Sequence, residues 1–224
     1  MRQRRSKEAD MASVEPEKAK DTTEKEKVKV NLKDPEATSF AIPAVFTVVP
    51  LCLGYGIASA IYNFGAHSTY SKKLDAVGDG RWGYAAAVVL GRTIVLLNMM
   101  PLKYKNGWAA LDAGNARANP FIFKSTDGKH VLLEDEGTIG KYNRTNRSVH
   151  HMIETYGCLV AGLYMSSQVF PLPTFVLTCL YCVGRLAHSV GYAKGYGGHA
   201  PGFMLQTLAL STVEGLLAFV AINA

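Results

Sequence analysis

Residues 40–62 read FAIPAVFTVVPLCLGYGIASAIY, and none of these 23 side chains carries a charge. An α-helix rises ~1.5 Å per residue, so this run is long enough to cross the ~30 Å hydrocarbon core of a bilayer. Pro43 and Pro50 would be costly inside a soluble helix but are tolerated in membrane helices. The run also exceeds the ~7–15 apolar residues of a signal peptide, so we interpret it as a retained membrane span.

Four more apolar segments follow along the chain. They are Gly83–Leu102, His151–Phe170, Leu172–Ala193 and Phe203–Ile222, and a proline turn at 170–173 lies between the second and third of them. No segment shows the period-two alternation of a half-buried strand. Because lipid offers the backbone no hydrogen-bond partners, the sequence predicts an all-α polytopic membrane helix bundle.

The charged residues lie mostly outside these spans. Residues 1–36 contain 10 Lys or Arg and 9 Asp or Glu, whereas the other 188 residues contain 14 and 9. A segment with so much charge and so few large apolar residues cannot bury enough surface to fold, so 1–36 is expected to be a disordered tail. We therefore divide the chain into this tail, an extra N-terminal span with its connection at 37–82, and a four-helix membrane domain at 83–224.

The basic residues of the connections predict the orientation. With five spans, 19 Lys and Arg fall in the tail and in the connections 103–148 and 194–202, and 3 fall on the other side. Because Lys and Arg accumulate in cytoplasmic loops, the tail and the long connection are expected in the cytosol. The expected protein is an integral membrane protein of the endoplasmic reticulum with a cytosolic N-terminus.

The cysteines give no sign of a disulfide framework or a metal site. Cys52, Cys158, Cys179 and Cys182 all lie within apolar segments. A secreted disulfide framework would place them in polar loops, and a zinc site would need further ligands nearby. Cys179 and Cys182 spell C-x-x-C, but no second pair accompanies them. We expect buried thiols.

The ionisable residues inside the spans form two ordered sets. The first is Arg147, His151 and Glu154, the second is Arg185, His188 and Tyr192, and each set shares one helical face. Each ionisable group costs ~2.5–3.5 kcal/mol on insertion scales, which makes it a candidate for function. A guanidinium, an imidazole and a carboxylate suit a small zwitterion with carboxylates and an amine. The alternative is that these side chains only cap helices, pair with one another or reach the headgroups.

These residues resemble a known family. Four features follow one another along the chain: Arg147-x-x-x-His151-x-x-Glu154-Thr155, a proline turn, Gly184-Arg185-x-x-His188-x-x-x-Tyr192 and Ala200-Pro201. This order is similar to that of the MAPEG family, the membrane-associated proteins of eicosanoid and glutathione metabolism. The likeness covers about residues 84–224 and includes Ala116–Pro120, which is similar to an Ala-Asn-Pro element of the family's first cytosolic loop. The span at 40–62 and the charged tail lie outside this pattern.

The resemblance implies a four-helix unit that forms a homotrimer and binds glutathione between neighbouring subunits. Carried over by position, the pocket would be lined by Arg147, Glu154, Arg185, His188 and Tyr192, and by His151 where the family usually has Asn. Small residues let membrane helices approach closely, so Gly157, Ala161 and Gly162 are expected at the trimer contact. The expected partners are the lipid bilayer and an apolar small-molecule or lipid substrate, with no nucleic acid.

The activity that the resemblance implies is a glutathione-dependent membrane transferase or peroxidase acting on apolar electrophiles or lipid hydroperoxides. Family members that form a glutathione thiolate often place an arginine just after the Ala-Pro element, whereas here Gly202-Phe203-Met204 follows Pro201. A thiol with a pKa of ~8.5 needs a nearby cation or donor to ionise at neutral pH. Arg92, His199 and Tyr192 are the candidates for this role.

Two other functions stay open from the residues alone. One is a non-catalytic member of the same fold, which would serve as a lipid-binding or scaffold subunit of a membrane complex. The other is an unrelated five-span transporter, against which the lack of a visible inverted repeat speaks.

Overall fold

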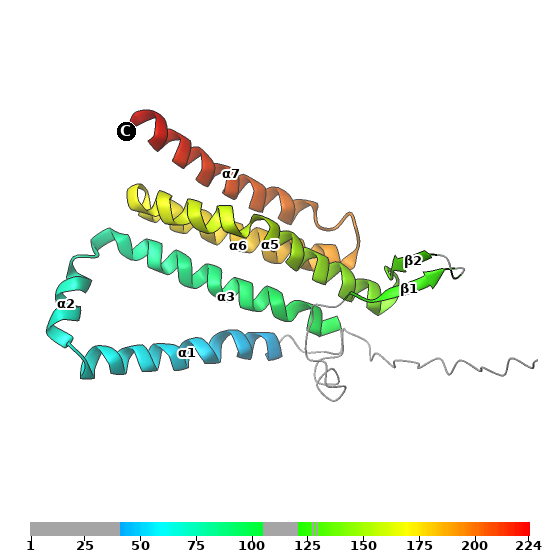
Figure 1. Cartoon of the computed structure of the whole chain (residues 1–224), viewed down its shortest axis with the longest axis horizontal. Helices are drawn as coiled ribbons and strands as arrows, with labels where there is room; N and C mark the ends of the chain where they lie inside the picture. The colour runs from blue at the N-terminus through cyan, green and yellow to red at the C-terminus, as the bar shows by residue number, and fades with distance from the viewer. Residues whose placement is uncertain (1–40, 105–120, 127, 129) are drawn as a thin grey trace, which may run out of the picture. The chain divides into compact units, whose positions relative to one another are not determined.

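The structure is a computed structural model that describes residues 41–104, 121–126, 128 and 130–224. The predicted tail at 1–36 and the Ala116–Pro120 element lie outside the described residues. The described part is mostly helical, and it confirms an all-α membrane helix bundle (Figure 1).

The elements follow one another along the chain with short connections at most junctions. They are α1 (Ala41–Phe64), α2 (His67–Asp75), the short 3-10 helix η2 (Gly78–Gly80), α3 (Arg81–Tyr104), β1 (Phe123–Thr126), β2 (His130–Leu133), α5 (Gly137–Val169), α6 (Pro171–Lys194) and α7 (Ala200–Asn223). Pro171 begins α6 directly after α5 ends, as the predicted proline turn requires, because proline fits the first helical position.

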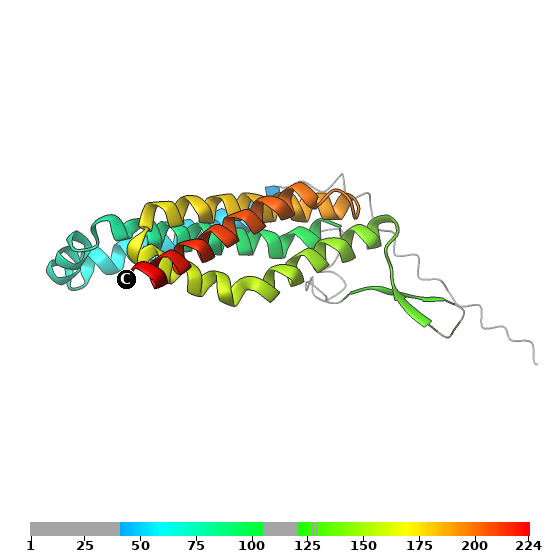
Figure 2. The ribbon, with the colours of Figure 1, turned by 90° about the horizontal axis from the view of Figure 1, so that it is seen from above.

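Four helical stretches of the described chain are long and apolar enough to cross a membrane. They are Pro43–Phe64, Gly78–Tyr104, Pro171–Lys194 and Ala200–Asn223. The predicted span at His151–Phe170 is not among them, because Glu154, Ser166 and Gln168 lower the hydropathy of its helix. That helix, α5, has 33 residues and begins at Gly137, before the predicted start. It nevertheless packs against α3, α6 and α7 along the bundle (Figure 2).

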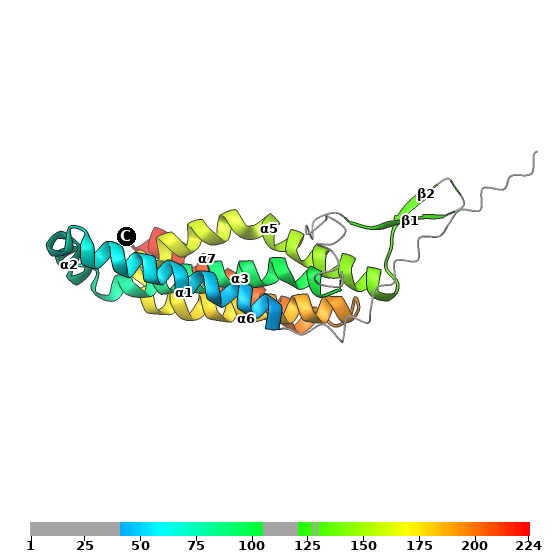
Figure 3. The same cartoon turned by 90° about the horizontal axis from the view of Figure 1, so that it is seen from below.

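Helices α3, α5, α6 and α7 form one four-helix unit around a common core. The buried residues of this core are Leu90, Leu159, Leu163, Tyr181, Cys182, Ala209 and Val213. Helix α1 lies outside this unit and contacts α3 (Figure 3). Most of its side chains are exposed, and the guanidinium Nη1 of Arg92 on α3 donates to the Thr47 carbonyl of α1 at 3.4 Å.

Close glycine contacts join α6 to α7. A Cβ added at Gly184 would lie 2.6 Å from the backbone nitrogen of Gln206, and one added at Gly202 would overlap the backbone nitrogen of His188. The two helices approach this closely because neither position carries a side chain. The contact brings the start of α7 against the second half of α6.

The predicted role of Gly162 at a trimer contact is wrong. Gly162 is buried, and a Cβ there would lie 3.2 Å from a methyl carbon of Val213. This glycine therefore allows close packing against α7 of the same chain. Gly157 and Ala161 are exposed on the outer side of α5.

The cysteines follow the expectation only in part. All four are free thiols, with Cys182 buried and Cys179 partly buried. Cys52 and Cys158 are exposed on the outer surfaces of α1 and α5, so the expectation of buried thiols is wrong for these two. Their helices present them away from the bundle core.

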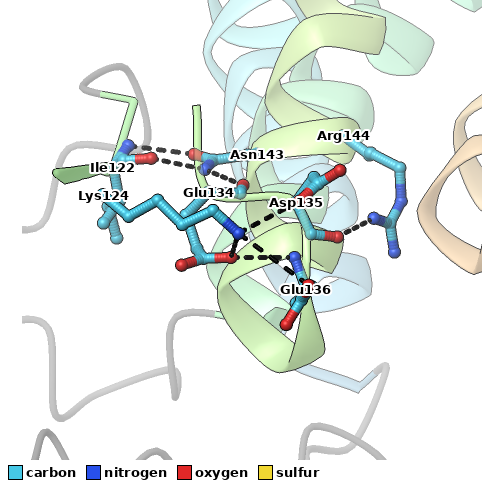
Figure 4. Close-up of polar contacts among 7 residues, drawn as sticks. All are labelled: Ile122, Lys124, Glu134, Asp135, Glu136, Asn143 and Arg144. Atoms are coloured by element: carbon cyan, nitrogen blue, oxygen red, sulfur yellow. Dashed lines mark hydrogen bonds and ion pairs between the residues drawn. The ribbon is translucent and has the colours of Figure 1, made fainter. Parts of the chain in front are cut away.

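A β-hairpin precedes α5, and the sequence analysis did not predict it. Strands β1 and β2 pair antiparallel, with Phe123 opposite Leu133, and Gly128 lies in the turn with φ +71°. Asn143 of α5 closes the base of the hairpin, since its Oδ1 accepts from Ile122 N at 3.0 Å and its Nδ2 donates to Glu134 O at 2.6 Å (Figure 4). The hairpin is therefore fixed to the first turns of α5.

Electrostatic contacts stabilise the same junction. The Glu134 carboxylate accepts from the backbone N–H of Glu136 at 3.0 Å and from Lys124 Nζ at 3.3 Å. The Glu136 N–H, followed by Lys124, lowers the pKa of Glu134, and the hydrogen bond to Glu134 raises the pKa of Lys124. The ionised form of each group is thus the one that the folded chain favours.

Candidate functional site

The two predicted sets meet through His151. Its Nδ1 lies 3.2 Å from Arg185 Nη1, and its ring stacks on that of His188 with centroids 5.8 Å apart. Tyr192 also stacks on His188, with ring centroids 5.6 Å apart. The structure therefore brings together four of the six predicted site residues. They come from two helical faces, which the sequence alone could not place next to each other.

Arg185 is the most deeply buried member of this cluster, with 1% of its surface exposed. Its Nη1 donates to Gln206 Oε1 at 2.7 Å, and its Nη2 donates to the Ser148 carbonyl. These acceptors are neutral, and no carboxylate of the described residues forms an ion pair with it. Burying a charge is costly unless it is paired, so the interior here holds an uncompensated positive charge.

Arg147 and Glu154 do not join this buried cluster. They form an ion pair with each other at 3.5 Å, and about half of each side chain is exposed (53% and 54%). They share the helical face of His151, as predicted, but they lie at its outer edge while the His151 ring turns toward α6. An exposed guanidinium and carboxylate pair thus borders the buried cluster.

Helix α7 and the residue before it supply three residues outside the predicted set of six, of which His199 was named only as a candidate for stabilising a thiolate. Gln206 holds Arg185, while the rings of His199 and Phe203 lie 5.3 and 6.1 Å from that of His188. The three positions follow an i, i+4, i+7 spacing and share one face of α7 and its approach. Phe203 follows the Ala200-Pro201 element, after which the resemblance implied an arginine in members that form a thiolate.

Of the three candidates for stabilising a thiolate, two lie in the cluster. His199 and Tyr192 contact each other with ring centroids 5.0 Å apart. Arg92 does not reach the cluster, because its guanidinium is directed at α1 through the Thr47 carbonyl. The possibility that Arg92 turns inward is therefore wrong in this structure.

The cluster contains buried polar atoms without hydrogen-bond partners among the described residues. They are Arg185 Nε, His188 Nδ1, His199 Nδ1, Ser148 Oγ and Ser189 Oγ. An unsatisfied buried donor or acceptor costs ~1–3 kcal/mol, so several at one place indicate a site that a polar ligand or ordered water completes.

Arg144 positions the end of α6 that carries Tyr192. Its Nε donates to the Tyr192 carbonyl at 3.2 Å and its Nη2 to the Ala193 carbonyl at 3.1 Å, while its Nη1 donates to the Asp135 carbonyl (Figure 4). A cation at a helix C-terminus satisfies the last carbonyls and complements the helix dipole. Sequence reasoning missed this role, because no spacing rule relates residue 144 to residue 192.

The model of the MAPEG family matches residues 82–219. The match begins at the start of α3, ends within α7, contains all six predicted site residues and leaves out α1. No curated protein matches the chain. The match covers more than half of the chain and agrees with the four-helix unit and its membrane-spanning helices. This chain belongs to the MAPEG family of integral membrane proteins, which are related to glutathione and eicosanoid metabolism.

Proposed function

We propose that this chain is a glutathione-dependent membrane transferase or peroxidase acting on apolar electrophiles or lipid hydroperoxides. The observation that carries the proposal is the buried guanidinium of Arg185, which has only neutral acceptors among the described residues. A cation inside a membrane bundle without a counter-ion favours an anionic ligand nearby. Glutathione, with two carboxylates and an ionisable thiol, is such a ligand.

The residues present fit this ligand. In the exposed pair, the guanidinium of Arg147 could bind a carboxylate of glutathione, and the carboxylate of Glu154 could bind its amine. His151 and Tyr192 are partly buried between this pair and the interior, where His188 has an unpartnered Nδ1. In the proposed homotrimer a neighbouring subunit would cover the outer face of α5 and close the site around the ligand.

Bound glutathione would supply the thiolate that attacks the electrophile. The chain's part is to favour the thiolate over the thiol and to orient it toward a substrate that enters from the bilayer. His199 and Tyr192 are the donors that we assign to thiolate stabilisation, because Phe203 stands where an arginine is common in the family. We expect the membrane to be that of the endoplasmic reticulum.

Glutathione binding tests the proposal directly. Thermal unfolding of the detergent-solubilised protein should shift upward in a saturable way, since a ligand that binds only the folded state stabilises it by ~2.7 kcal/mol at 100 times its Kd. Arg147→Ala and Glu154→Gln should each weaken binding about tenfold, the equivalent of ~1.4 kcal/mol for a charged hydrogen bond. Glu214→Gln, which removes an exposed carboxylate of α7 outside the cluster, is the matched control. Normal binding by both site variants would refute this pocket.

The second candidate function is a non-catalytic lipid-binding or scaffold subunit, and Phe203 is the observation that favours it. For a thiol whose pKa lies above neutral pH, each additional pKa unit reduces the thiolate population at neutral pH about tenfold. The ultraviolet absorbance of bound glutathione against pH distinguishes the two functions. Thiolate at pH 7 in the wild type supports the enzyme, whereas thiolate that appears at pH 7 only in Phe203→Arg supports the non-catalytic subunit.

A further inference from the structure

A groove lies where α1, α2 and the start of α3 meet. The family model does not match α1 or α2. Its volume is about 520 Å³, which falls within the ~300–1,000 Å³ range of small-molecule sites. Ala58 and Ile61 of α1, Leu74 of α2 and Val77 form its apolar walls. The groove is at the end of the bundle where α5 ends, since a Cβ on Gly83 would lie 3.2 Å from the Ser167 side chain.

The turn between α1 and α2 gives this groove a defined end. Gly65 N donates to Ile61 O at 3.0 Å, and His67 N donates to Gly65 O at 2.8 Å. A Cβ at Gly65 would lie 3.1 Å from the Tyr70 ring, so the absence of a side chain lets this ring pack on the turn. Tyr62 packs edge-on against His67 with ring centroids 4.6 Å apart. Both tyrosines line the groove.

The polar lining of the groove is cationic. Lys73 and Arg81 line it, whereas Asp75 and Asp79 do not. Neither cation forms an ion pair with another of the described residues, and the Arg81 guanidinium lies 5.3 Å over the Trp82 ring. The groove therefore combines an apolar surface with two positive charges that the described chain does not neutralise.

The groove lies at the boundary between membrane and water. The apolar stretch of α1 ends at Phe64 and that of α3 begins at Gly78, so the segment between them marks the edge of the hydrocarbon core. Tyrosine and tryptophan are enriched at this depth, as Tyr62, Tyr70 and Trp82 are here. An occupant at this level has its headgroup beside the cations and its chains beside the apolar walls.

A larger cavity extends the same space along the bundle. Its volume is about 1040 Å³, and it shares Lys73, Val77 and Tyr84 with the groove before continuing between α3 and α5. Val160 and Leu163 of α5 line this extension. The two spaces together offer an apolar surface longer than the groove alone, with Lys73, Arg81 and the Asp79 carboxylate of the larger cavity at one end.

We propose that the groove binds an anionic phospholipid, whose phosphate contacts Lys73 and Arg81 and whose acyl chains lie between α1 and α3 and toward α5. A phosphate accepts charge-assisted hydrogen bonds from Lys and Arg, so two cations without ion-pair partners beside apolar walls suit such a headgroup. Such a lipid also covers the contact between α1 and the four-helix unit, where protein contacts are few. The groove lies near Ser167 at the end of α5, whereas His151 lies near the middle of that helix, and the site does not depend on glutathione binding.

Native mass spectrometry of the full-length chain in detergent, titrated with phosphatidylglycerol or phosphatidylcholine, tests the charge recognition. The wild type should retain phosphatidylglycerol in preference to phosphatidylcholine. Lys73→Gln with Arg81→Gln should weaken phosphatidylglycerol binding about thirtyfold, the equivalent of ~2 kcal/mol for two basic residues. Lys72→Gln, on the same helix but outside the lining, should leave it unchanged. An equal loss in the Lys72 variant would show non-specific surface attraction and overturn the site.

A second pair of variants tests the apolar walls without changing charge. Ala58→Phe fills the groove and should reduce retention of phosphatidylglycerol at least as strongly as the charge variants, whereas Ala60→Phe, two residues on and outside the lining, should not. Inorganic phosphate at millimolar concentration should not displace the lipid, because it lacks the chains. Retention by the Ala58 variant, or displacement by phosphate, would overturn the proposal.

Discussion

Arg185 connects three helices at the candidate site. Its guanidinium joins α5, α6 and α7 through the Ser148 carbonyl, His151 and Gln206. Hydrogen bonds to a charged group are worth ~1.5–3 kcal/mol, and removing one partner leaves the other unsatisfied in the interior. The same residue therefore supports the fold and sets the electrostatic potential of the site.

A double-mutant cycle measures this coupling. Arg185→Met and Gln206→Leu should each destabilise the protein. The double variant should be less destabilised than their sum by ~1.5–3 kcal/mol, because neither member of the Arg185–Gln206 hydrogen bond is then left without the other. The free energy of unfolding in detergent is the measurement. The exposed pair Arg147→Met and Glu154→Leu is the control, with a coupling of ~0–1 kcal/mol expected. Equal coupling in the two cycles would contradict the role of Arg185.

The junction between hairpin and α5 should depend on pH through Glu134. Its pKa is lowered in the folded chain, chiefly by the Glu136 N–H, so its contribution is present above the unfolded pKa of ~4.3 and is lost as pH falls through the folded value. Hydrogen-exchange protection of residues 121–136, corrected for intrinsic rates, should fall below that pH.

Two variants separate Glu134 from its neighbours. Glu134→Gln should remove the acid dependence and lower the protection at neutral pH. Glu136→Gln should keep the dependence, because the Glu136 carboxylate is 85% exposed and lies 3.9 Å from Lys124 Nζ. An acid dependence that survives in Glu134→Gln would assign the effect to another group.

At the scale of the elements, the spans with uniform apolar composition were predictable and α5 was predictable only in part. Residues 137–150 carry many polar side chains, of which Asn143, Thr145 and Ser148 are buried against the protein. Hydropathy reports which side chains suit lipid, so it cannot detect a helix whose polar face is buried in a polar interior. The start of α5 was missed for this reason.

The hairpin and part of the site were missed for related physical reasons. Each strand has four residues, too few for an alternation to stand out. His151, Arg185 and Tyr192 were proposed as site residues because a helical period relates them to other ionisable residues. Gln206 is an amide within a mostly apolar helix, and its partner becomes visible only when α6 and α7 are packed together.

That packing depends on Gly202. Gly202→Ala should destabilise the protein by ~1–3 kcal/mol, because its methyl group would overlap the backbone of α6 at His188 and force the helices apart. Gly215→Ala on the same helix is the control, since no atom lies within 4 Å of its Cβ position. Thermal unfolding in detergent compares the two. Equal stability would show that the α6–α7 contact can relax around the added group.

At the scale of the whole molecule, the number of membrane crossings decides where the termini lie. Four described stretches meet the criteria for a span, and α5 would be a fifth crossing beside them. An odd number of crossings places the two termini on opposite sides of the membrane. The topology of the chain thus tests whether α5 crosses the bilayer despite its lower hydropathy.

Epitope tags at Met1 and after Ala224 make this test practical in sealed microsomes. We expect protease to digest the N-terminal tag and to spare the C-terminal tag, because the basic residues favour a cytosolic tail. Digestion of both tags would show that α5 does not cross. Protection of the N-terminal tag alone would reverse the orientation. Detergent, which should expose both tags, is the control.

The contact between Arg92 and the Thr47 carbonyl has a consequence for the order of synthesis. Helix α1 leaves the ribosome before α3, so the acceptor is already in the bilayer when Arg92 arrives there. An arginine at the centre of a span costs ~2.5–3.5 kcal/mol to insert, and a waiting carbonyl offsets part of that cost. The first helix thus provides a hydrogen-bond acceptor that lowers the cost of inserting the third.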